Sequence, residues 1–269
     1  MSPEPEAYVH GHHDSVLRAH RWRTVENSAA YLLPHLSQAA RVLDVGCGPG
    51  SITLGLAART PGGQVVGVDL SDEVIGQARS EAARQGRANV VFEAGDAYAL
   101  RFGNATFDVV HAHQLLQHLS DPPAALAELR RVCRPGGLVA ARDADYGGMC
   151  WYPVVPELEE WRSLYSRVAR AVGGEPDAGR RALSWARSAG FSEVTTSAST
   201  WCFADPLERD WWGSLWAERL TESRFADHAR RHAEVTPVEL ERLAAAWREW
   251  AAADDGCFLV PHGEVLCRR

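Results

Sequence analysis

The chain contains no lysine, and all 28 of its basic residues are arginine. A phosphate-binding P-loop needs a lysine at the end of Gly-x-x-x-x-Gly-Lys, so this kind of nucleotide site is excluded. The six cysteines form no Cys-x-x-Cys pair. Their spacing therefore predicts neither a zinc site nor a disulfide framework.

Long hydrophobic runs are also missing. No stretch approaches the roughly 20 apolar residues of a membrane span, and the start of the chain lacks the basic segment and apolar core of a secretory leader. We therefore expect a cytoplasmic protein with no membrane partner. The net charge of −7 gives no general reason to bind nucleic acid. With 269 residues, of which 46% are hydrophobic, we expect one large domain with an appendage.

The most informative segment that is present is a glycine-rich turn at residues 42–50, Val-Leu-Asp-Val-Gly-Cys-Gly-Pro-Gly. An apolar strand that carries an acid leads into three glycines at alternate positions, and a helix-forming run begins at Ser51. Glycine lets the backbone turn tightly and approach a ligand without a Cβ in the way. The following helix N-terminus offers unpaired N–H groups. The third glycine of the dinucleotide fingerprint would fall at Ser51, so the spacing is a different one.

Further strands follow in order, and each ends in a polar residue. Residues 64–71 are predicted as a buried strand that ends in Asp69, at about the spacing expected for a ribose-binding carboxylate. Residues 89–97 are predicted as a third strand that ends in Gly-Asp-Ala, and residues 107–113 as a fourth. A fifth strand begins at Leu138, after a helix and an Arg-Pro-Gly-Gly turn.

These motifs, in this order over residues 41–145, resemble the class I S-adenosylmethionine (SAM) methyltransferases, and among them the ubiquinone/menaquinone-biosynthesis-like group. The resemblance implies an α/β fold. This would be a Rossmann-like, seven-stranded, doubly wound sheet with a helical N-terminal cap and a helical insertion between the last two strands. It also implies SAM as cofactor, S-adenosylhomocysteine as product, and no metal. The expected parts are 1–40 as cap, 41–204 as SAM-binding core, 205–254 as helical lid and 255–269 as final strand.

The resemblance also implies roles for single residues. Asp69 would accept hydrogen bonds from both ribose hydroxyls, and Asp96 with Ala97 would recognise the adenine amino edge. Arg23 is our candidate for the methionine carboxylate, because a guanidinium pairs bidentately with a carboxylate; a solvated surface arginine is the alternative. The predicted cofactor-binding residues are Arg23, Asp44, Gly46, Cys47, Gly48, Gly50, Asp69, Leu70, Asp96, Ala97 and His113.

A sulfonium methyl is already activated, so its transfer needs mainly alignment and exclusion of water. A general base is needed only when the acceptor loses a proton. The candidates for such a base are His113, Asp145, Tyr146 and His12. His113 alternates with His111 along the fourth strand, so only one of the two can face the cofactor side. A purely structural role is the alternative for His113.

Outside the motifs, helices are predicted over residues 12–40 and near 156–172 and 177–189. The sixth strand is expected over 191–203, and residues 205–254 are expected to be wholly helical. An insertion at this point would emerge on the ligand side of the sheet. The last strand is expected to be interrupted near Pro261.

The acceptor is expected to be a small molecule rather than a nucleic acid, and the protein a monomer or homodimer. Most of the ten tryptophans should pack the lid itself, with at least one lining the acceptor pocket. Residues 20–36 and 143–152 are similar to bacterial secondary-metabolite methyltransferases, including enzymes that methylate the indole C3 of tryptophan-containing cyclodipeptides. Quinone or polyketide O- or C-methylation is one alternative. A non-catalytic SAM-binding regulator, or an enzyme that uses SAM for another reaction, would be an alternative of a different class.

Overall fold

The computed structural model describes residue 20 and residues 22–269. Its strands form one sheet in the order β3-β2-β1-β4-β5-β8-β6, and β7 pairs with β8. The first five are parallel, whereas β8 runs antiparallel to β5, β6 and β7. The strands are β1 (Arg41–Val45), β2 (Gln64–Asp69), β3 (Val90–Ala94), β4 (Phe107–His113), β5 (Cys133–Ala144), β6 (Cys150–Tyr152), β7 (Glu193–Phe203) and β8 (Cys257–Arg268). This confirms the Rossmann-like α/β fold, with the short β6 added.

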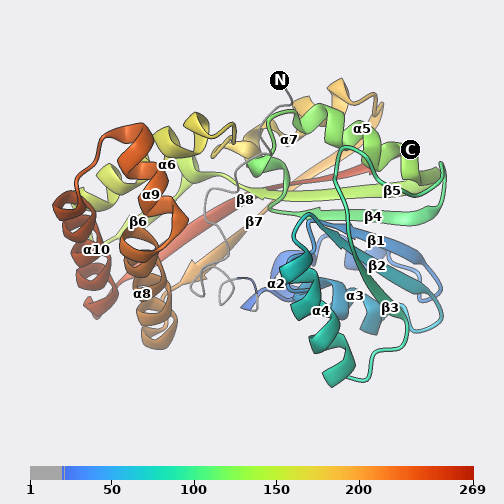
Figure 1. Ribbon diagram of the computed structural model, residues 1–269, viewed down its shortest axis with the longest axis horizontal. Helices are drawn as coiled ribbons and strands as arrows, with labels where there is room; N and C mark the ends of the chain where they lie inside the picture. The colour runs from blue at the N-terminus through green and yellow to red at the C-terminus, as the bar shows by residue number, and fades with distance from the viewer. Residues whose placement is uncertain (1–19, 21) are drawn as a thin grey trace.

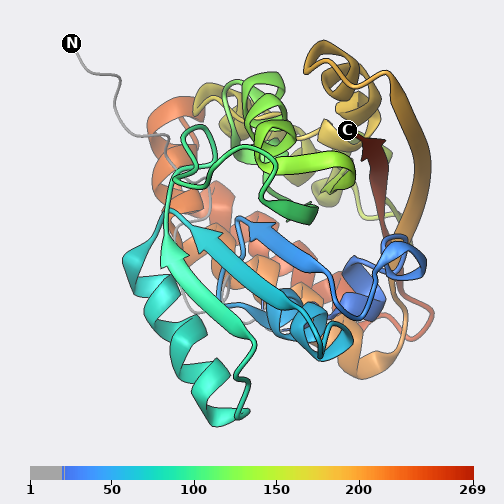
Figure 2. The same ribbon diagram turned by 90° about the vertical axis from the view of Figure 1, so that its right-hand side faces the viewer.

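Helices cover both faces of the parallel half of the sheet. On one face, α2 (Val25–Ser28) and α3 (Ser51–Arg59) pack on apolar side chains of β1, β2 and β4, and α4 (Asp72–Arg84) packs on β3. On the other face lie α5 (Pro122–Val132) and α7 (Ala178–Ser188). Figure 2 shows α4 and α5 on opposite sides of the sheet. The near-continuous burial of β1, β2 and β4 is what a parallel sheet covered on both faces requires.

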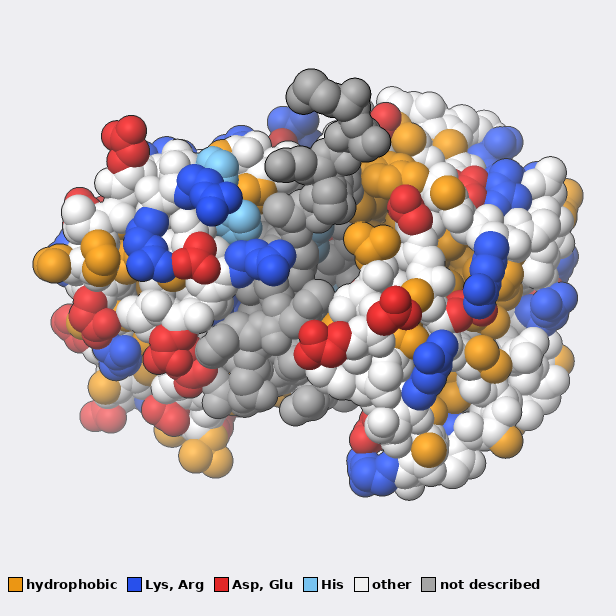
Figure 3. Space-filling model, viewed as in Figure 1, with side chains coloured by type: hydrophobic (Ala, Val, Ile, Leu, Met, Phe, Trp, Pro, Cys, Tyr) orange, Lys and Arg blue, Asp and Glu red, His pale blue; other side chains and the backbone are white. Residues whose placement is uncertain are grey.

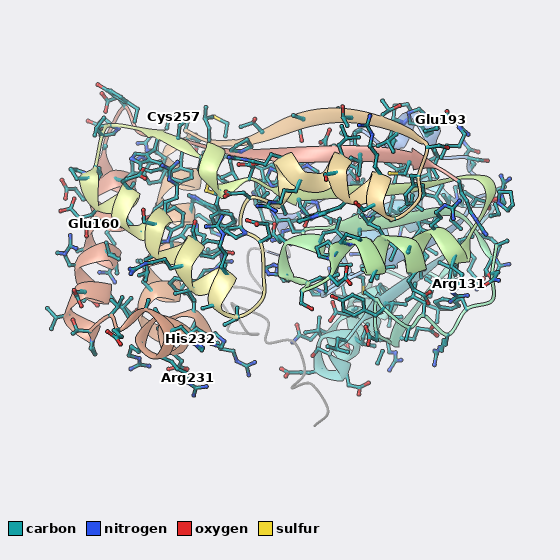
Figure 4. All side chains as sticks on the ribbon, turned by 90° about the horizontal axis from the view of Figure 1, so that it is seen from above. Arg131, Glu160, Glu193, Arg231, His232 and Cys257 are labelled. Carbon is teal, nitrogen blue, oxygen red and sulfur yellow. The ribbon has the colours of Figure 1, made fainter. Side chains whose placement is uncertain are left out.

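The remaining long helices form a separate helical body at one end of the molecule (Figure 1). It consists of α6 (Pro156–Ala171), α8 (Pro206–Glu222), α9 (Arg224–Ala233) and α10 (Pro237–Ala252). They share one hydrophobic cluster with β6 and with the adjoining ends of β7 and β8. The chain enters α8 from the end of β7 and returns from α10 into β8, where Cys202 Sγ and Cys257 Sγ lie 3.9 Å apart. Cys257 and Glu193 mark the two ends of the long β7–β8 pair (Figure 4).

Three element predictions need correction. Residues 23–40 hold only α2 and the 3-10 turn η1 (Leu33–His35), because Thr24 caps a new start and Pro34 begins a tighter turn. Residues 205–254 form three helices, with new starts capped by Ser223 and Thr236. Strand β8 is continuous through Pro261. The proline falls between the residues that pair with β6 and those that pair with β5, where the ladder on that side is already interrupted.

The residues of the sixth strand begin two positions later than expected, at Glu193. Two further 3-10 turns lie near the carboxyl end of the parallel strands, η2 (Leu116–His118) and η3 (Tyr146–Gly148). No helix among the described residues is long and apolar enough to cross a membrane. On the face shown in Figure 3, arginine and acidic side chains are interspersed rather than gathered by sign.

Candidate active site

The glycine-rich loop connects β1 to α3. Gly46, Gly48 and Gly50 have φ values of +71°, +54° and +84°, in the region that residues with a Cβ rarely adopt. A Cβ on Gly50 would lie 2.7 Å from Phe92 Cζ, and one on Gly46 would lie 2.9 Å from Leu115 Cδ1. Both positions therefore favour glycine for conformation, and at Gly50 the ring of Phe92 also leaves no room for a Cβ.

Asp69, at the end of β2, lies directly against this loop. The backbone N–H of Gly48 donates to Asp69 Oδ2 at 2.9 Å, and Oδ1 accepts from the backbone N–H two residues further on, at 3.1 Å. The N–H groups of Gly46 and Cys47 donate to the carbonyl oxygen of Val68, at 2.8 and 3.0 Å. Each carboxylate oxygen of Asp69 has a second lone pair, so the side chain can still accept from a diol.

The end of β3 meets the same edge. The N–H of Gly95 donates to the carbonyl oxygen of Asp69 at 2.9 Å, which sets Asp96 and Ala97 beside the end of β2. Asp96 is exposed, and Ala97 is half-buried. The side chain of Leu70 is 65% exposed. An exposed apolar side chain next to an acid suits a nucleoside, whose base is apolar on its faces and whose sugar carries hydroxyls.

Asp44, also predicted to bind the cofactor, lies in the interior beneath the glycine-rich loop. It is buried, and both of its carboxylate oxygens are engaged. Thr53 Oγ1 donates to Oδ2 at 2.6 Å, and His111 Nδ1 lies 2.7 Å from Oδ1. Asp44 thus ties β1 to α3 and β4 beneath the loop, which is a positioning role. Burial raises the pKa of the neighbouring Cys47 thiol well above its usual range, so Cys47 stays a neutral thiol.

A chain of hydrogen bonds crosses the site from the N-terminal segment to β8. Arg23 Nη2 donates to Gln114 Oε1 at 2.6 Å, and Gln114 Nε2 lies 2.8 Å from His262 Nε2. Burial lowers the pKa of His262 well below its usual range, so its imidazole is neutral. Its Nδ1 lies 2.9 Å from the carbonyl oxygen of Val260. Nδ1 therefore carries the proton, and Nε2 accepts from Gln114.

A pocket lies between the N-terminal segment, the carboxyl ends of β4 and β5, and α8. Its cavity is narrow in this structure, with a volume of about 20 Å³ open to the centre of a water molecule. Four tryptophans line it: Trp22, Trp201, Trp211 and Trp212. The polar lining includes two arginines, Arg23 and Arg219, and none of the described lining residues is an aspartate or a glutamate.

Residues 36–196 match the methyltransferase domain family. The chain belongs to this family. It is 37% identical to an uncharacterized methyltransferase of Schizosaccharomyces pombe, over 97% of this chain and 96% of that protein. It is 32% identical to the malonyl-[acyl-carrier protein] O-methyltransferase of Pseudescherichia vulneris, over 82% of this chain and 80% of that protein.

The fold is similar to that of phosphoethanolamine N-methyltransferase 2 of Haemonchus contortus in complex with S-adenosyl-L-methionine. The TM-score is 0.55 at 20% identity, over 89% of this chain and 51% of that chain. Its membership of the methyltransferase domain family and its full-length similarity to a methyltransferase identify the protein as an enzyme, a methyltransferase of the SAM-dependent class.

The structure places the side chain of His113, the first predicted candidate for a base, in the interior of the fold. His113 is buried, and neither of its ring nitrogens has a hydrogen-bond partner among the described residues. Its ring packs against those of His262 and Trp201, with centroids 6.2 and 5.8 Å away. Burial, and then the charge of Arg142, lower the pKa of His113 well below its usual range. His113 is not among the residues that line the pocket, where the next residue, Gln114, lies.

The structure also gives Asp145 a structural role. Its carboxylate accepts from Arg180 Nε at 2.7 Å and from the N–H of Gly148 at 3.0 Å, so it holds the loop after β5 against α7. Tyr146 does line the pocket, and its ring stacks on that of Tyr165 with centroids 3.9 Å apart. Burial raises the pKa of the Tyr146 phenol, which is therefore protonated at neutral pH. His12 lies outside the described residues.

Several lining residues of the methyltransferase had no predicted role, among them Gln114, Gln117 and Arg219. Gln114 directly follows the fourth strand, and this place at a strand end was the one signal in the sequence for a role in the site. Arg219 could not have been found in this way, because it is one of several arginines in a long helical stretch without a motif. Among the helical tryptophans, Trp216, Trp247 and Trp250 are fully buried in the helical body, as expected for most of them.

Proposed function

We propose that this methyltransferase transfers the methyl group of SAM to a small aromatic acceptor held in the pocket beside α8. The observation that carries the proposal is the tryptophan lining of that pocket, at the carboxyl ends of β4 and β5. Small-molecule pockets are mostly apolar and aromatic, with few polar groups. Acceptors in open α/β sheets lie at this same edge, where the glycine-rich loop and Asp69 also lie.

Bound SAM would supply a methyl carbon activated by a sulfonium sulfur. We assign its ribose hydroxyls to Asp69, its adenine amino edge to Asp96 and Ala97, and its methionine carboxylate to Arg23. The free lone pairs of Asp69 and the exposed apolar side chain of Leu70 support this assignment. The protein's own task is then to align the acceptor and exclude water, and the side chains with which α8 lines the pocket support a role of this helix in both.

The acceptor we favour is an aromatic secondary metabolite. The indole C3 of a tryptophan-containing cyclodipeptide and the hydroxyl or carbon of a quinone or polyketide precursor are the two candidates. The name of the Pseudescherichia relative, an O-methyltransferase, supports an oxygen nucleophile. The tryptophan wall supports an aromatic ring in either case.

Two measurements test the proposal. Calorimetry with SAM and with S-adenosylhomocysteine should show micromolar or tighter binding of both. A screen of aromatic acceptors should then show release of S-adenosylhomocysteine that depends on the acceptor. Absence of binding for both cofactor forms would refute the cofactor assignment, and turnover with large protein or nucleic-acid acceptors alone would refute the small-molecule acceptor.

A further inference from the structure

We infer that Cys202 and Cys257 form a modification site, a pair of thiols that a small-molecule disulfide oxidises to a reversible protein disulfide. This bond closes the base of the three helices α8, α9 and α10. The inference goes beyond the proposed function and does not depend on which acceptor the enzyme uses. It begins from the distance between Cys202 Sγ and Cys257 Sγ, which is 3.9 Å.

The two cysteines lie diagonally across the end of the β7–β8 pair. Cys202 is opposite Leu259 in the antiparallel register, and Cys257 is two residues from Leu259, so both side chains lie on the same face of the sheet. The last pair of this ladder is Phe203 with Phe258, and Cys257 lies just beyond it. A disulfide requires the two sulfur atoms to approach to about 2.05 Å. Because the ladder ends before Cys257, the backbone there has room for that movement.

Solvent reaches this pair more readily than the buried thiols of the chain. Cys202 is exposed and Cys257 is half-buried. Cys133 and Cys267 are buried, and burial raises their pKa to about 11 and about 12. The thiolate is the reactive form of cysteine. Cys133 and Cys267, like Cys47, therefore stay neutral thiols at physiological pH, and oxidation is directed to the end of the β7–β8 pair.

A third accessible thiol, that of Cys150, lies on the other side of β8. Cys150 is exposed, and it is opposite Leu259 on the β6 side as Cys202 is on the β7 side. Burial is the main cause that raises the pKa of Cys257, and the hydrogen bond with Cys202 and the charges of the Cys202 and Cys150 thiolates act in the same direction. Cys202 is the more exposed member of the pair, so it is the first to meet an oxidant.

The oxidation consists of two thiol–disulfide exchanges. The Cys202 thiolate attacks one sulfur of the small disulfide, whose S–S bond breaks, and one half leaves as a thiol that takes up the proton lost by Cys202. The Cys257 thiolate then attacks the Cys202 sulfur, and the second half leaves in the same way with the proton of Cys257. Two protein thiols are oxidised, and one small-molecule disulfide is reduced to two thiols. An excess of small thiol reverses both steps.

The bond has a structural consequence because of what lies between its ends. Helices α8, α9 and α10 all fall between Cys202 and Cys257 in the chain. The neighbours of Cys202 on β7 contact the pocket side of the fold, since Trp201 lines the pocket and Phe203 stacks on Trp212 with centroids 4.3 Å apart. A cross-link that closes a long segment restricts its unfolded states. The oxidised enzyme should therefore resist unfolding of the three helices better than the reduced enzyme.

The test uses the full-length enzyme equilibrated in buffers of reduced and oxidised glutathione. Free thiols are then blocked with N-ethylmaleimide, and the protein is digested with trypsin, which cleaves after arginine. Cys202 falls in the peptide 188–209, Cys257 in 249–268 and Cys150 in 143–162. Mass spectrometry shows which peptides are linked, and fragmentation distinguishes Cys257 from Cys267 in the same peptide. The variants are Cys202→Ser and Cys257→Ser, with Cys150→Ser as the control that removes a neighbouring exposed thiol.

We expect the parent and Cys150→Ser to link peptide 188–209 to peptide 249–268 through Cys257. Cys202→Ser and Cys257→Ser should instead carry glutathione on the cysteine that remains. The oxidised parent should melt about 5 °C or more above the reduced parent, and dithiothreitol should abolish the difference. Neither Cys202→Ser nor Cys257→Ser should show this shift.

Two results would overturn the inference. Unreacted thiols, or glutathione bound separately to Cys202 and Cys257 of the parent, would refute the paired site. A link that leaves the melting temperature unchanged would refute its effect on the three helices. None of these measurements involves SAM or an acceptor, so their outcome is separate from that of the tests of the proposed function.

Discussion

Asp69, the residue proposed to bind the ribose, is held by hydrogen bonds from the backbone. Its carboxylate accepts hydrogen bonds from the backbone N–H of Gly48 and from that of the residue two positions ahead, so it links the glycine-rich loop to the end of β2. A carboxylate held by backbone donors is already oriented when a diol arrives, and little side-chain entropy remains to be lost. The effect of changing this residue should therefore be large.

Asp69→Ala should weaken SAM binding by roughly 2–4 kcal/mol, because charge-assisted hydrogen bonds to two hydroxyls are removed. Calorimetry measures this directly. The matched control is Asp72→Ala, which removes the same charge from the exposed first turn of α4, three residues away. The ribose assignment would be wrong if both variants bound SAM like the parent.

Asp143 leads to a prediction about pH. It is 1% exposed, its Oδ1 accepts from the N–H of Gln117 at 3.0 Å, and its Oδ2 has no hydrogen-bond partner among the described residues. Burial raises its pKa from 3.8 to about 7. The folded state therefore binds the proton more tightly than the unfolded state. The free energy of unfolding should fall as the pH rises from about 4 to 7, and the penalty is complete above that.

Asp143→Asn keeps an oxygen for the Gln117 N–H and removes the ionisation. This variant should be more stable than the parent at pH 8, by on the order of 2–4 kcal/mol, and the difference should shrink towards pH 4. Urea denaturation at pH 5 and pH 8 measures both values. A difference that does not depend on pH would show that Asp143 is not a buried titrating acid.

At the scale of elements, α8 joins two environments. Trp216 and Trp212 fix it in the helical body, while Trp211, Trp212 and Arg219 face the pocket. Side chains that such a packed helix presents to the pocket have little conformational freedom. This favours binding of one specific acceptor over binding of many different ones. We therefore expect changes in this helix to affect acceptor binding more than cofactor binding.

Trp211→Ala should raise the acceptor KM or lower kcat while SAM affinity stays within a few-fold, because the side chain lines the pocket but lies outside the predicted cofactor contacts. Trp185→Ala is the control, since Trp185 is also partly buried but packs in the cluster beneath α5 and α7. Steady-state kinetics and calorimetry separate the two effects. Equal kinetic losses in both variants would point to general destabilisation instead.

The elements show why some of the structure could be predicted and some could not. The parallel strands and the glycine loop follow from local patterns: apolar runs, glycine at positive φ and an acid at a strand end. Strand β8 continues through Pro261 because its pairing partner changes there from β6 to β5. The sequence of one strand does not tell which strands pair with it. For the same reason the place of Arg219 in the pocket wall could not be predicted, because it depends on how Trp216 of α8 packs against Trp161 of α6.

At the scale of the molecule, two bodies share one sheet. Nine of the ten tryptophans lie in or against the cluster of the helical body, and Trp185 alone packs in the cluster under α5 and α7. Strand β8 contributes side chains to both clusters, with Phe258 in the first and Val265 in the second. Strand β8 thus joins the helical body to the parallel half of the sheet.

Unfolding should therefore be a single transition. Tryptophan fluorescence reports mainly on the helical body, whereas far-ultraviolet circular dichroism reports on the whole chain. We expect the two midpoints to coincide in a denaturant titration, because loss of one body unpairs the strand that completes the other. Phe258→Ala, at a fully buried position of β8, should lower both midpoints together, at a cost of roughly 3–5 kcal/mol. Two separated midpoints would contradict this coupling.

The point where α8 departs and α10 returns has a consequence for how such enzymes diversify. The chain leaves the end of β7 and re-enters β8 beside it, with Cys202 and Cys257 close together across the pair. A segment whose two ends meet can be lengthened, shortened or exchanged without moving the strands that hold it. A related protein could acquire a new acceptor by inheriting a different insertion at this junction, and its methyl-donor chemistry would be untouched.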